Sequence, residues 1–221
     1  MNKQAGNMYD FVTHTWNPIR GKCKHDCSYC YMKRFPQKDL KLDEKTLNEN
    51  LGKNNFIFVG SSTDLFEDSV NFDHISDVIH KCNDNKQNKY LFQSKNPNRM
   101  RGLIASLFEG ECILATTIET NRKYEEMGAT PEPYKRSFEM RQAKEKGFIT
   151  AITIEPIMDF DIDELVNILE FAKPDFVNIG ADSGKCNLPE PSKEKVLELI
   201  ARLNKFTKIN KKNNISRLIG E

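Results

Sequence analysis

The sequence predicts an α/β fold in which short strands alternate with longer helices. Two observations support this prediction. Short apolar runs rich in β-branched residues recur along the chain, and the segments between them carry apolar residues at helical spacing. The alternation is typical of βα units that build a parallel sheet, and we count six such units. Six right-handed crossovers either curl into an incomplete barrel or flatten into a doubly wound sheet, and periodicity alone is compatible with both.

The predicted strands are short, and each is followed by polar residues. They are expected over residues 9–14, 56–60, 90–93, 112–118, 148–154 and 176–180. Three helix starts are recognised from a capping residue before proline or from a capping box. These starts lie at Asn96-Pro97, at Thr130-Pro131 and at Asp161 with Glu164.

Three of the predicted helices carry an apolar stripe, which is the face that packs on a sheet. The stripes are Ile75, Val78, Ile79 and Cys82; Leu165, Ile168, Leu169 and Ala172; and Val196, Leu199, Ile200 and Leu203. We therefore expect each of these helices to cover the predicted sheet with that face.

The composition indicates one folded domain. Of 221 residues, 38% are apolar and 29% are charged, which argues against a disordered or fibrous chain. We expect a single domain over residues 1–221, with a core over about 8–205 and a basic, solvated tail over 206–221. No apolar run has the length of a signal peptide or a membrane span, so we expect a cytoplasmic protein with no membrane partner. The net charge of +1 leaves nucleic-acid binding to local clusters of basic residues.

Three cysteines directly follow the first predicted strand, at Cys23, Cys27 and Cys30. The chain has six cysteines, which in a reducing compartment are not expected to form three structural disulfides. A 4Fe-4S cluster normally has four cysteine ligands, so three leave one iron open to an exogenous chelator. The amine and carboxylate of a free amino acid could bind that iron together.

This Cys-x-x-x-Cys-x-x-Cys pattern, with the aromatic Tyr29 before the third cysteine, resembles the signature of radical SAM enzymes. The resemblance implies a 4Fe-4S cluster on the three cysteines, with S-adenosyl-L-methionine on the open iron. In such enzymes the cluster supplies an electron that breaks the sulfonium bond, and the 5′-deoxyadenosyl radical then abstracts hydrogen from a substrate. It also implies an external reductant such as flavodoxin or ferredoxin.

Two other interpretations of the cysteines stay open. One is a zinc site of the three cysteines with His25 or His14 as the fourth ligand, although zinc sites usually space paired cysteines by two. The other is that the cysteines are merely buried or reactive, for which a polar loop is a poor setting.

Polar residues at the ends of five predicted strands extend the resemblance, because ligands of βα folds bind at the carboxyl ends of strands. They lie at 60–66, 94–97, 116–121, 154–156 and 179–184. With the cysteines, they resemble a phage-associated radical SAM family of unknown function, related to the spore photoproduct lyase group, over the chain from Trp16 to Ser183. The resemblance implies a partial (β/α)6 TIM-like barrel of the radical SAM type.

The same resemblance implies roles for individual residues. The methionine amino group is assigned to Gly60, Ser61 and Ser62, the methionine carboxylate to Ser94 and Lys95, the ribose to Glu119, and adenine to Tyr29 and Gly180. Glu155 is assigned to the same site, either beside a lysine or arginine or in contact with the substrate. Each residue also has an ordinary structural interpretation, such as a helix cap for Asp64 or a turn for Gly180.

The remaining cysteines receive separate predictions. Cys186 follows the sixth strand, where a thiol could donate a hydrogen atom to a substrate radical; the alternative is an ordinary loop cysteine. Cys82 and Cys112 lie on an apolar helix face and at a strand start, and both are expected in the core.

The substrate is the least constrained prediction. The resemblance favours a nucleic acid base or a nucleotide, with phosphate contacts from basic residues. These are Lys33, Arg34, Arg99, Arg101, Lys208, Lys211 and Lys212. The alternatives are a radical SAM enzyme that acts on a small molecule or peptide, and a zinc-dependent nucleic-acid-binding module without catalysis.

Overall fold

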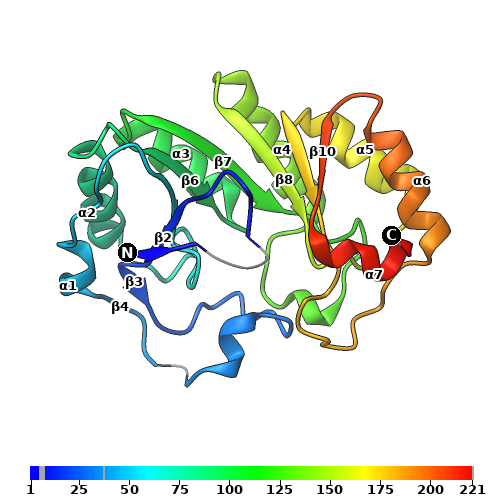
Figure 1. The fold of residues 1–221 in the computed structure, drawn as a ribbon, viewed down its shortest axis with the longest axis horizontal. Coiled ribbons are helices and arrows are strands. Elements are labelled where there is room, and N and C mark those ends of the chain that lie inside the picture. Colours follow the sequence, from blue (N-terminus) through cyan, green and yellow to red (C-terminus); the bar gives the residue numbers. More distant parts are fainter. Residues whose placement is uncertain (5–7, 37, 221) are drawn as a thin grey trace.

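The computed structural model describes residues 1–4, 8–36 and 38–220, in which one curved sheet of eight strands carries the fold (Figure 1). The strands are β1 (Asn2–Lys3), β2 (His14–Trp16), β5 (Phe56–Val59), β6 (Lys89–Gln93), β7 (Glu111–Thr117), β8 (Ile149–Ile154), β9 (Phe176–Ile179) and β10 (Lys208–Lys211). Their order in the sheet is β1-β2-β5-β6-β7-β8-β9-β10. All neighbours are parallel except β1, which pairs antiparallel with β2.

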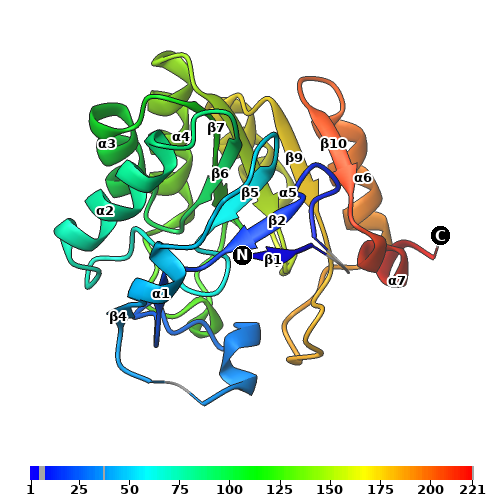
Figure 2. The ribbon, with the colours of Figure 1, turned by 60° about the vertical axis from the view of Figure 1, so that its left-hand side comes forward.

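The helices lie along the outer face of this sheet (Figures 1 and 2). The long ones are α2 (Phe72–Asn83), α3 (Pro97–Leu107), α4 (Pro133–Glu145), α5 (Ile162–Ala172) and α6 (Lys193–Leu203). The short elements are α1 (Glu44–Leu47), α7 (Ser216–Ile219), the 3-10 turns η1 (Tyr31–Arg34), η2 (Glu125–Met127) and η3 (Asn213–Ile215), and the hairpin of β3 (Ile19–Arg20) with β4 (Lys41–Leu42). Among the described residues, none of the helices combines the length and apolarity needed to span a bilayer.

The apolar stripes predicted on the helices are buried as expected. The stripes of α2 and α6 are buried at all four positions, and α5 buries Leu165, Leu169 and Ala172 while Ile168 is half-buried. The cap at Asn96 is confirmed, because its side chain accepts a hydrogen bond from the amide of Arg99. The other two helix starts differ from the prediction. Helix α4 begins at Pro133 rather than after Thr130, and Asp161 precedes α5 without capping it, because its carboxylate binds Arg122 instead.

The inner face of the sheet is apolar at its centre. Alternate residues of a strand point to opposite faces, so Phe58, Leu91 and Ala115 face inward while their neighbours pack against the helices. The segment 9–13 was predicted as part of the first strand, but the strand begins only at His14. Tyr9 packs instead against the inner face, where its hydroxyl bonds to Gln93 and Thr153, 2.8 Å from each.

The C-terminal segment corrects the prediction of a solvated tail over 206–221, of which residue 221 lies outside the described residues. Residues Lys208–Lys211 form β10, a seventh parallel strand that pairs with β9. Lys208 and Lys211 are exposed, while Ile209 and Phe206 pack against the core. The charged ends of this short strand hid its apolar contribution from the sequence pattern.

Candidate active site

The carboxyl ends of the parallel strands surround a cavity of about 840 Å³. The loops that follow the strands gather at one end of the sheet, which is the lower edge in Figure 1. Ten of the predicted site residues line this cavity: Cys23, Cys27, Tyr29, Cys30, Gly60, Ser61, Ser62, Ser94, Lys95 and Glu155. The other three, Glu119, Gly180 and Cys186, are not among its lining residues.

The cysteine loop, residues 22–30, is held by short turns and by contact with η2. Cys30 donates its amide to the carbonyl of Cys27 at 3.2 Å, and the thiol of Cys27 donates to the carbonyl of Met127 at 3.2 Å. Gly128 has a φ of 63°, and a Cβ there would lie 2.0 Å from the carbonyl oxygen of His25. Glycine is therefore required at this position for the loop to pack as it does.

Asp64 joins the cysteine loop to β5 and β6, a role that the sequence analysis missed when it interpreted this residue as a cap. One carboxylate oxygen accepts from Ser94 Oγ at 2.7 Å, and the other accepts from the Lys95 amide at 2.8 Å and His25 Nε2 at 3.0 Å. Burial raises the pKa of Asp64, but these hydrogen bonds outweigh it and hold the pKa below its usual range. The cap-like contact exists as well, since Asp64 also accepts from the amide of Phe66.

The second predicted segment, residues 60–62 after β5, is bound to the chain around the cysteine loop. Asn17 accepts hydrogen bonds from Ser61 Oγ at 3.1 Å and from the amide of Ser62 at 2.9 Å. The hydroxyl of Tyr31 donates to the carbonyl of Ser61 at 3.1 Å. Gly60 has a φ of 75°, which favours glycine at this position, whereas Gly180, for which a turn was the alternative interpretation, has no positive φ. Asn17 was not predicted as a site residue, although it directly follows β2.

A buried network of charges lies beneath the cysteine loop. Lys95 Nζ is 2.5 Å from Glu119 Oε1, 2.6 Å from the hydroxyl of Tyr29 and 3.5 Å from Cys27 Sγ. Tyr29 also donates to Glu119 Oε1, while Arg136 Nη1 lies 2.9 Å from Glu119 Oε2. The expected contact of Glu119 with ribose does not fit this arrangement, because the carboxylate is fully buried and both of its oxygens are bound.

Electrostatics fix the ionisation of this network. Burial raises the pKa of Glu119, but Arg136 and Lys95 more than compensate and hold it well below its usual range. Burial lowers the pKa of Lys95, and the Glu119 carboxylate reverses that effect so that the pKa is raised. Arg136, in α4, was not predicted; a buried arginine far along the chain from its partner leaves no local signal in a sequence.

The far wall of the cavity comes from β8, β9 and the segment after β10. Glu155 forms an ion pair with Lys212 at 2.6 Å and accepts a hydrogen bond from Asn214 at 3.0 Å, so a lysine is present among the partners left open for it. Lys212 also lies 4.9 Å from the centre of the Tyr9 ring. Gly180 packs behind this pair, because a Cβ there would lie 2.9 Å from the Glu155 carboxyl group.

Cys186 lies in the loop after β9, and its neighbours Ser183 and Gly184 line the cavity while Cys186 itself is exposed. Arg34 Nη2 donates to the carbonyl of Gly184 at 3.2 Å, which joins this loop to η1 across the cavity mouth. Partial burial and the Asp182 carboxylate raise the pKa of the Cys186 thiol. Cys82 is buried and Cys112 is half-buried against the core, as predicted.

The cysteine loop fits an iron–sulfur ligand set. All six thiols of the chain are free, and the three of the loop line the same cavity. Each cysteine of a cubane binds a different iron, so the ligands of a cluster do not converge on one point. Among the described residues, no three or more His, Cys, Asp or Glu side chains are placed to hold a single metal ion. Of the two suggested zinc ligands, His25 is bonded to Asp64 and His14 to the hydroxyl of Thr13.

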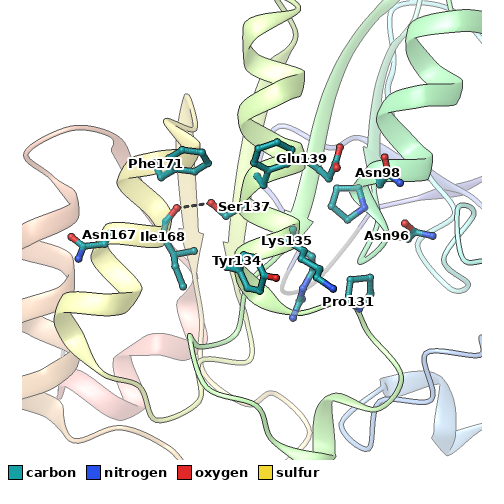
Figure 3. Close-up of a pocket in the computed structure, with 13 residues that line it drawn as sticks. Asn96, Asn98, Pro131, Tyr134, Lys135, Ser137, Glu139, Asn167, Ile168 and Phe171 are labelled. Atoms are coloured by element: carbon teal, nitrogen blue, oxygen red, sulfur yellow. Dashed lines mark hydrogen bonds between the residues drawn. The ribbon is translucent and has the colours of Figure 1, made fainter.

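A second cavity of about 610 Å³ lies outside the sheet, between α3, α4 and α5. Figure 3 shows Tyr134 and Ser137 from α4 facing Ile168 and Phe171 from α5, with the hydroxyl of Ser137 donating to the carbonyl of Ile168 at 2.6 Å. Arg136 lines this cavity, so its side chain separates the outer groove from the network around Glu119.

Comparisons with known proteins agree with this architecture. Residues 7–190 match the model of a family described as "Protein of unknown function (DUF5131)". No protein of curated function matches the chain. Spore photoproduct lyase complexed with dinucleoside spore photoproduct is similar in structure, with a TM-score of 0.65 and 13% identity over 93% of this chain and 78% of that chain. Streptococcus suis SuiB bound to S-adenosylmethionine has a TM-score of 0.58 and 12% identity, over 91% of this chain and 50% of that chain.

Both of these neighbours are radical SAM enzymes with partial TIM barrels, so the predicted fold is confirmed. The six predicted βα units form the barrel, and β10 adds a seventh parallel strand. The relation to phage-associated proteins stays a prediction.

Proposed function

The chain belongs to the DUF5131 family, and from that starting point we propose that it is a radical SAM enzyme. One observation carries the proposal: a loop of three free thiols and the polar ends of β5, β6 and β8 line a single cavity. The cavity lies at the carboxyl ends of the strands, where ligands of βα barrels bind. Its volume of about 840 Å³ lies near the upper end of the range for small-molecule sites.

In this proposal Cys23, Cys27 and Cys30 hold a 4Fe-4S cluster, and S-adenosyl-L-methionine binds beside it. The cluster would supply the electron that splits the sulfonium bond and yields a 5′-deoxyadenosyl radical. The hydroxyls of Ser61 and Ser62 would accept the methionine amino group. The carboxylate of the cofactor would face Lys95, whose ammonium is already directed to the cysteine loop.

The remaining residues would orient ligands and exclude water. Tyr29, with its hydroxyl bound to Lys95 and Glu119, would offer its ring to adenine. Gly180, which packs behind Glu155, would support the wall of the cavity. Glu119 would act beneath the site by holding Lys95 rather than by contacting ribose. Glu155 and Lys212 would face the substrate. They follow β8 and β10, whereas the cysteine loop follows β2 toward the other end of the sheet. A flavodoxin or ferredoxin would supply electrons.

For the substrate we propose a nucleic acid base or a nucleotide. Lys33, Arg34 and Lys212 line the cavity, where they could contact phosphates. Two of the other predicted basic residues are engaged elsewhere: Arg99 donates to backbone carbonyls, and Arg101 pairs with Glu139. A small molecule or peptide remains the second candidate, because the cavity is of small-molecule size.

The test begins with anaerobic purification. We expect brown protein with broad absorption near ~400 nm, whereas a zinc protein would be colourless. Reduction in the presence of S-adenosyl-L-methionine should then yield 5′-deoxyadenosine, measured by liquid chromatography and mass spectrometry. Replacing the three loop cysteines with alanine should remove the iron, while Cys112→Ala should retain it because that thiol lies against the core. Iron-free wild-type protein after reconstitution would rule the proposal out.

Substrate identity is tested by adding nucleotides, oligonucleotides, short peptides and small metabolites to the reduced enzyme. A nucleic-acid substrate should accelerate 5′-deoxyadenosine formation and itself gain or lose isotopic label. Its binding should weaken as salt is added, because phosphate contacts release counterions. Acceleration by peptides or small molecules alone would favour the second candidate.

A further inference from the structure

The buried network under the cysteine loop contains more positive than negative charge. Two cations, Lys95 and Arg136, share the single carboxylate of Glu119, and the side chains of Arg136 and Glu119 are fully buried. A buried charge is costly unless an opposite charge compensates it. The three side chains therefore leave one unit of positive charge without compensation.

The excess charge is located at the edge of the cavity. Glu119 divides its oxygens, with Oε2 facing Arg136 and Oε1 facing Lys95 and Tyr29. Lys95 is the member of the network that lines the cavity, and its ammonium is 3.5 Å from Cys27 Sγ. Asp64 also contacts Lys95, but its carboxylate binds the Lys95 backbone amide and His25 rather than the ammonium.

Arg136 has a side chain that is only partly satisfied. Its Nη1 binds Glu119 and the carbonyl of Thr117, whereas Nε and Nη2 are buried and find no hydrogen-bond partner among the residues that the structure describes. Incomplete pairing of a fully buried guanidinium costs stability. A role of the Arg136 charge in the site would account for an arginine at this costly position.

We propose that Arg136 is a positioning residue of the cofactor site: by binding Glu119, it leaves one unit of positive charge on Lys95 beside Cys27 and prepares that contact for an anionic ligand. Without Arg136, Glu119 would neutralise Lys95 completely. The inference rests on the proposed function in one respect, namely that the anionic ligand is a thiolate of the iron–sulfur cluster together with the cofactor carboxylate.

The test is a charge series. The formal charge of Lys95, Glu119 and Arg136 together is +1 in the wild type, 0 in Arg136→Met, +2 in Glu119→Gln and again +1 in the double variant. Positive charge favours reduction, so the reduction potential of the reconstituted cluster should be lowest in Arg136→Met and highest in Glu119→Gln. The double variant should return to the wild-type value.

A second measurement needs no cluster. In the cluster-free protein, Cys27 is alkylated by iodoacetate, which is anionic, or by iodoacetamide, which is neutral, and the products are quantified by peptide mass spectrometry. Both reagents attack the same thiolate, so the ratio of their rates reports the local charge. The ratio should change in the order of the charge series, with about threefold per unit charge as the scale for a charge about 7 Å away in water.

Controls separate this role from a structural one. Arg101→Met breaks an Arg–Glu pair of similar length, 2.8 Å to Glu139, away from the cavity and should change neither measurement. Circular dichroism and thermal unfolding verify folding, and if Arg136→Met does not fold, the double variant is compared with Glu119→Gln. The inference is overturned if the reduction potential and the alkylation ratio of the double variant equal those of Arg136→Met. Where Arg136→Met does not fold, it is overturned if they equal those of Glu119→Gln. If the wild-type protein is colourless but the alkylation ratios of the variants still follow the charge series, the proposed function is refuted and this inference stands.

Discussion

Replacement of Asp64 with alanine tests how strongly the cysteine loop is tied to the barrel. The carboxylate accepts four hydrogen bonds, from Ser94, His25 and the amides of Lys95 and Phe66. Asp64 lines the cavity with 11% of its side chain exposed, but its donors Ser94, His25 and Phe66 are buried, so its removal leaves them without this partner. Each buried unsatisfied group costs about 1–3 kcal/mol, and we expect a loss of about 3–5 kcal/mol in the free energy of unfolding once water has entered part of the space.

Urea denaturation followed by circular dichroism measures this loss. An exposed aspartate offers the matched control, because Asp73 lies on the surface of α2 and Asp73→Ala should change stability by less than about 0.5 kcal/mol. The slope of the transition should be unchanged if only the native state is affected. A loss below about 1 kcal/mol for Asp64→Ala would refute the view that Asp64 joins the loop to β5 and β6.

The same carboxylate makes a prediction about pH. Its pKa is lowered in the folded protein, so its contribution is fully present above the unfolded value, near 3.8, and is lost as pH falls through the lower folded pKa. The stability difference between wild type and Asp64→Ala should therefore be constant from pH 5 to pH 7 and shrink below about pH 4. A difference that grows on acidification would contradict this sign.

Three further predictions concern the walls of the site. Gly128→Ala should reduce iron bound per chain and lower the melting temperature, because its Cβ would lie 2.0 Å from the carbonyl of His25; iron content equal to wild type would refute this. Lys212→Met should lower the free energy of unfolding by about 1–3 kcal/mol in urea, because Glu155 loses its cation, whereas Lys208→Met on the exposed start of β10 should not. Cys186→Ala should abolish or divert product formation in the substrate-coupled reaction, and unchanged product would show that its thiol donates no hydrogen atom.

The strands that the sequence predicted correctly are those that appear as an apolar run in the sequence. Five strands lie within two residues of their expected bounds because each is an apolar run between polar residues. The segment around Tyr9 is equally apolar, but it packs against the inner face of the sheet instead of pairing as a strand. Both arrangements give the same apolar pattern, so the sequence could not distinguish them. Strand β10 was missed for the opposite reason, because Lys208 and Lys211 give an edge strand the composition of a tail.

The residues of the candidate site also differ in whether the sequence could predict them. Residues that directly follow a strand, such as Ser94 and Lys95, could be predicted because topology alone brings strand ends together. Arg136 could not, because it reaches the site from inside a helix. Lys212 was predicted only as a basic residue of the tail, and its pairing with Glu155 could not be predicted because the preceding strand was concealed. Glu119 could be predicted as a site residue because it follows a strand, whereas its ion pair with Arg136 could not.

The contact between Arg34 and Gly184 joins two loops at the mouth of the cavity. It is one solvent-exposed hydrogen bond of 3.2 Å between two loops from opposite ends of the strand order. Such a bond contributes about 0.5–1.5 kcal/mol net, so this one contact would be broken in roughly one molecule in ten even at the upper value. The two loops can therefore part at this point by thermal motion alone, without an energy source.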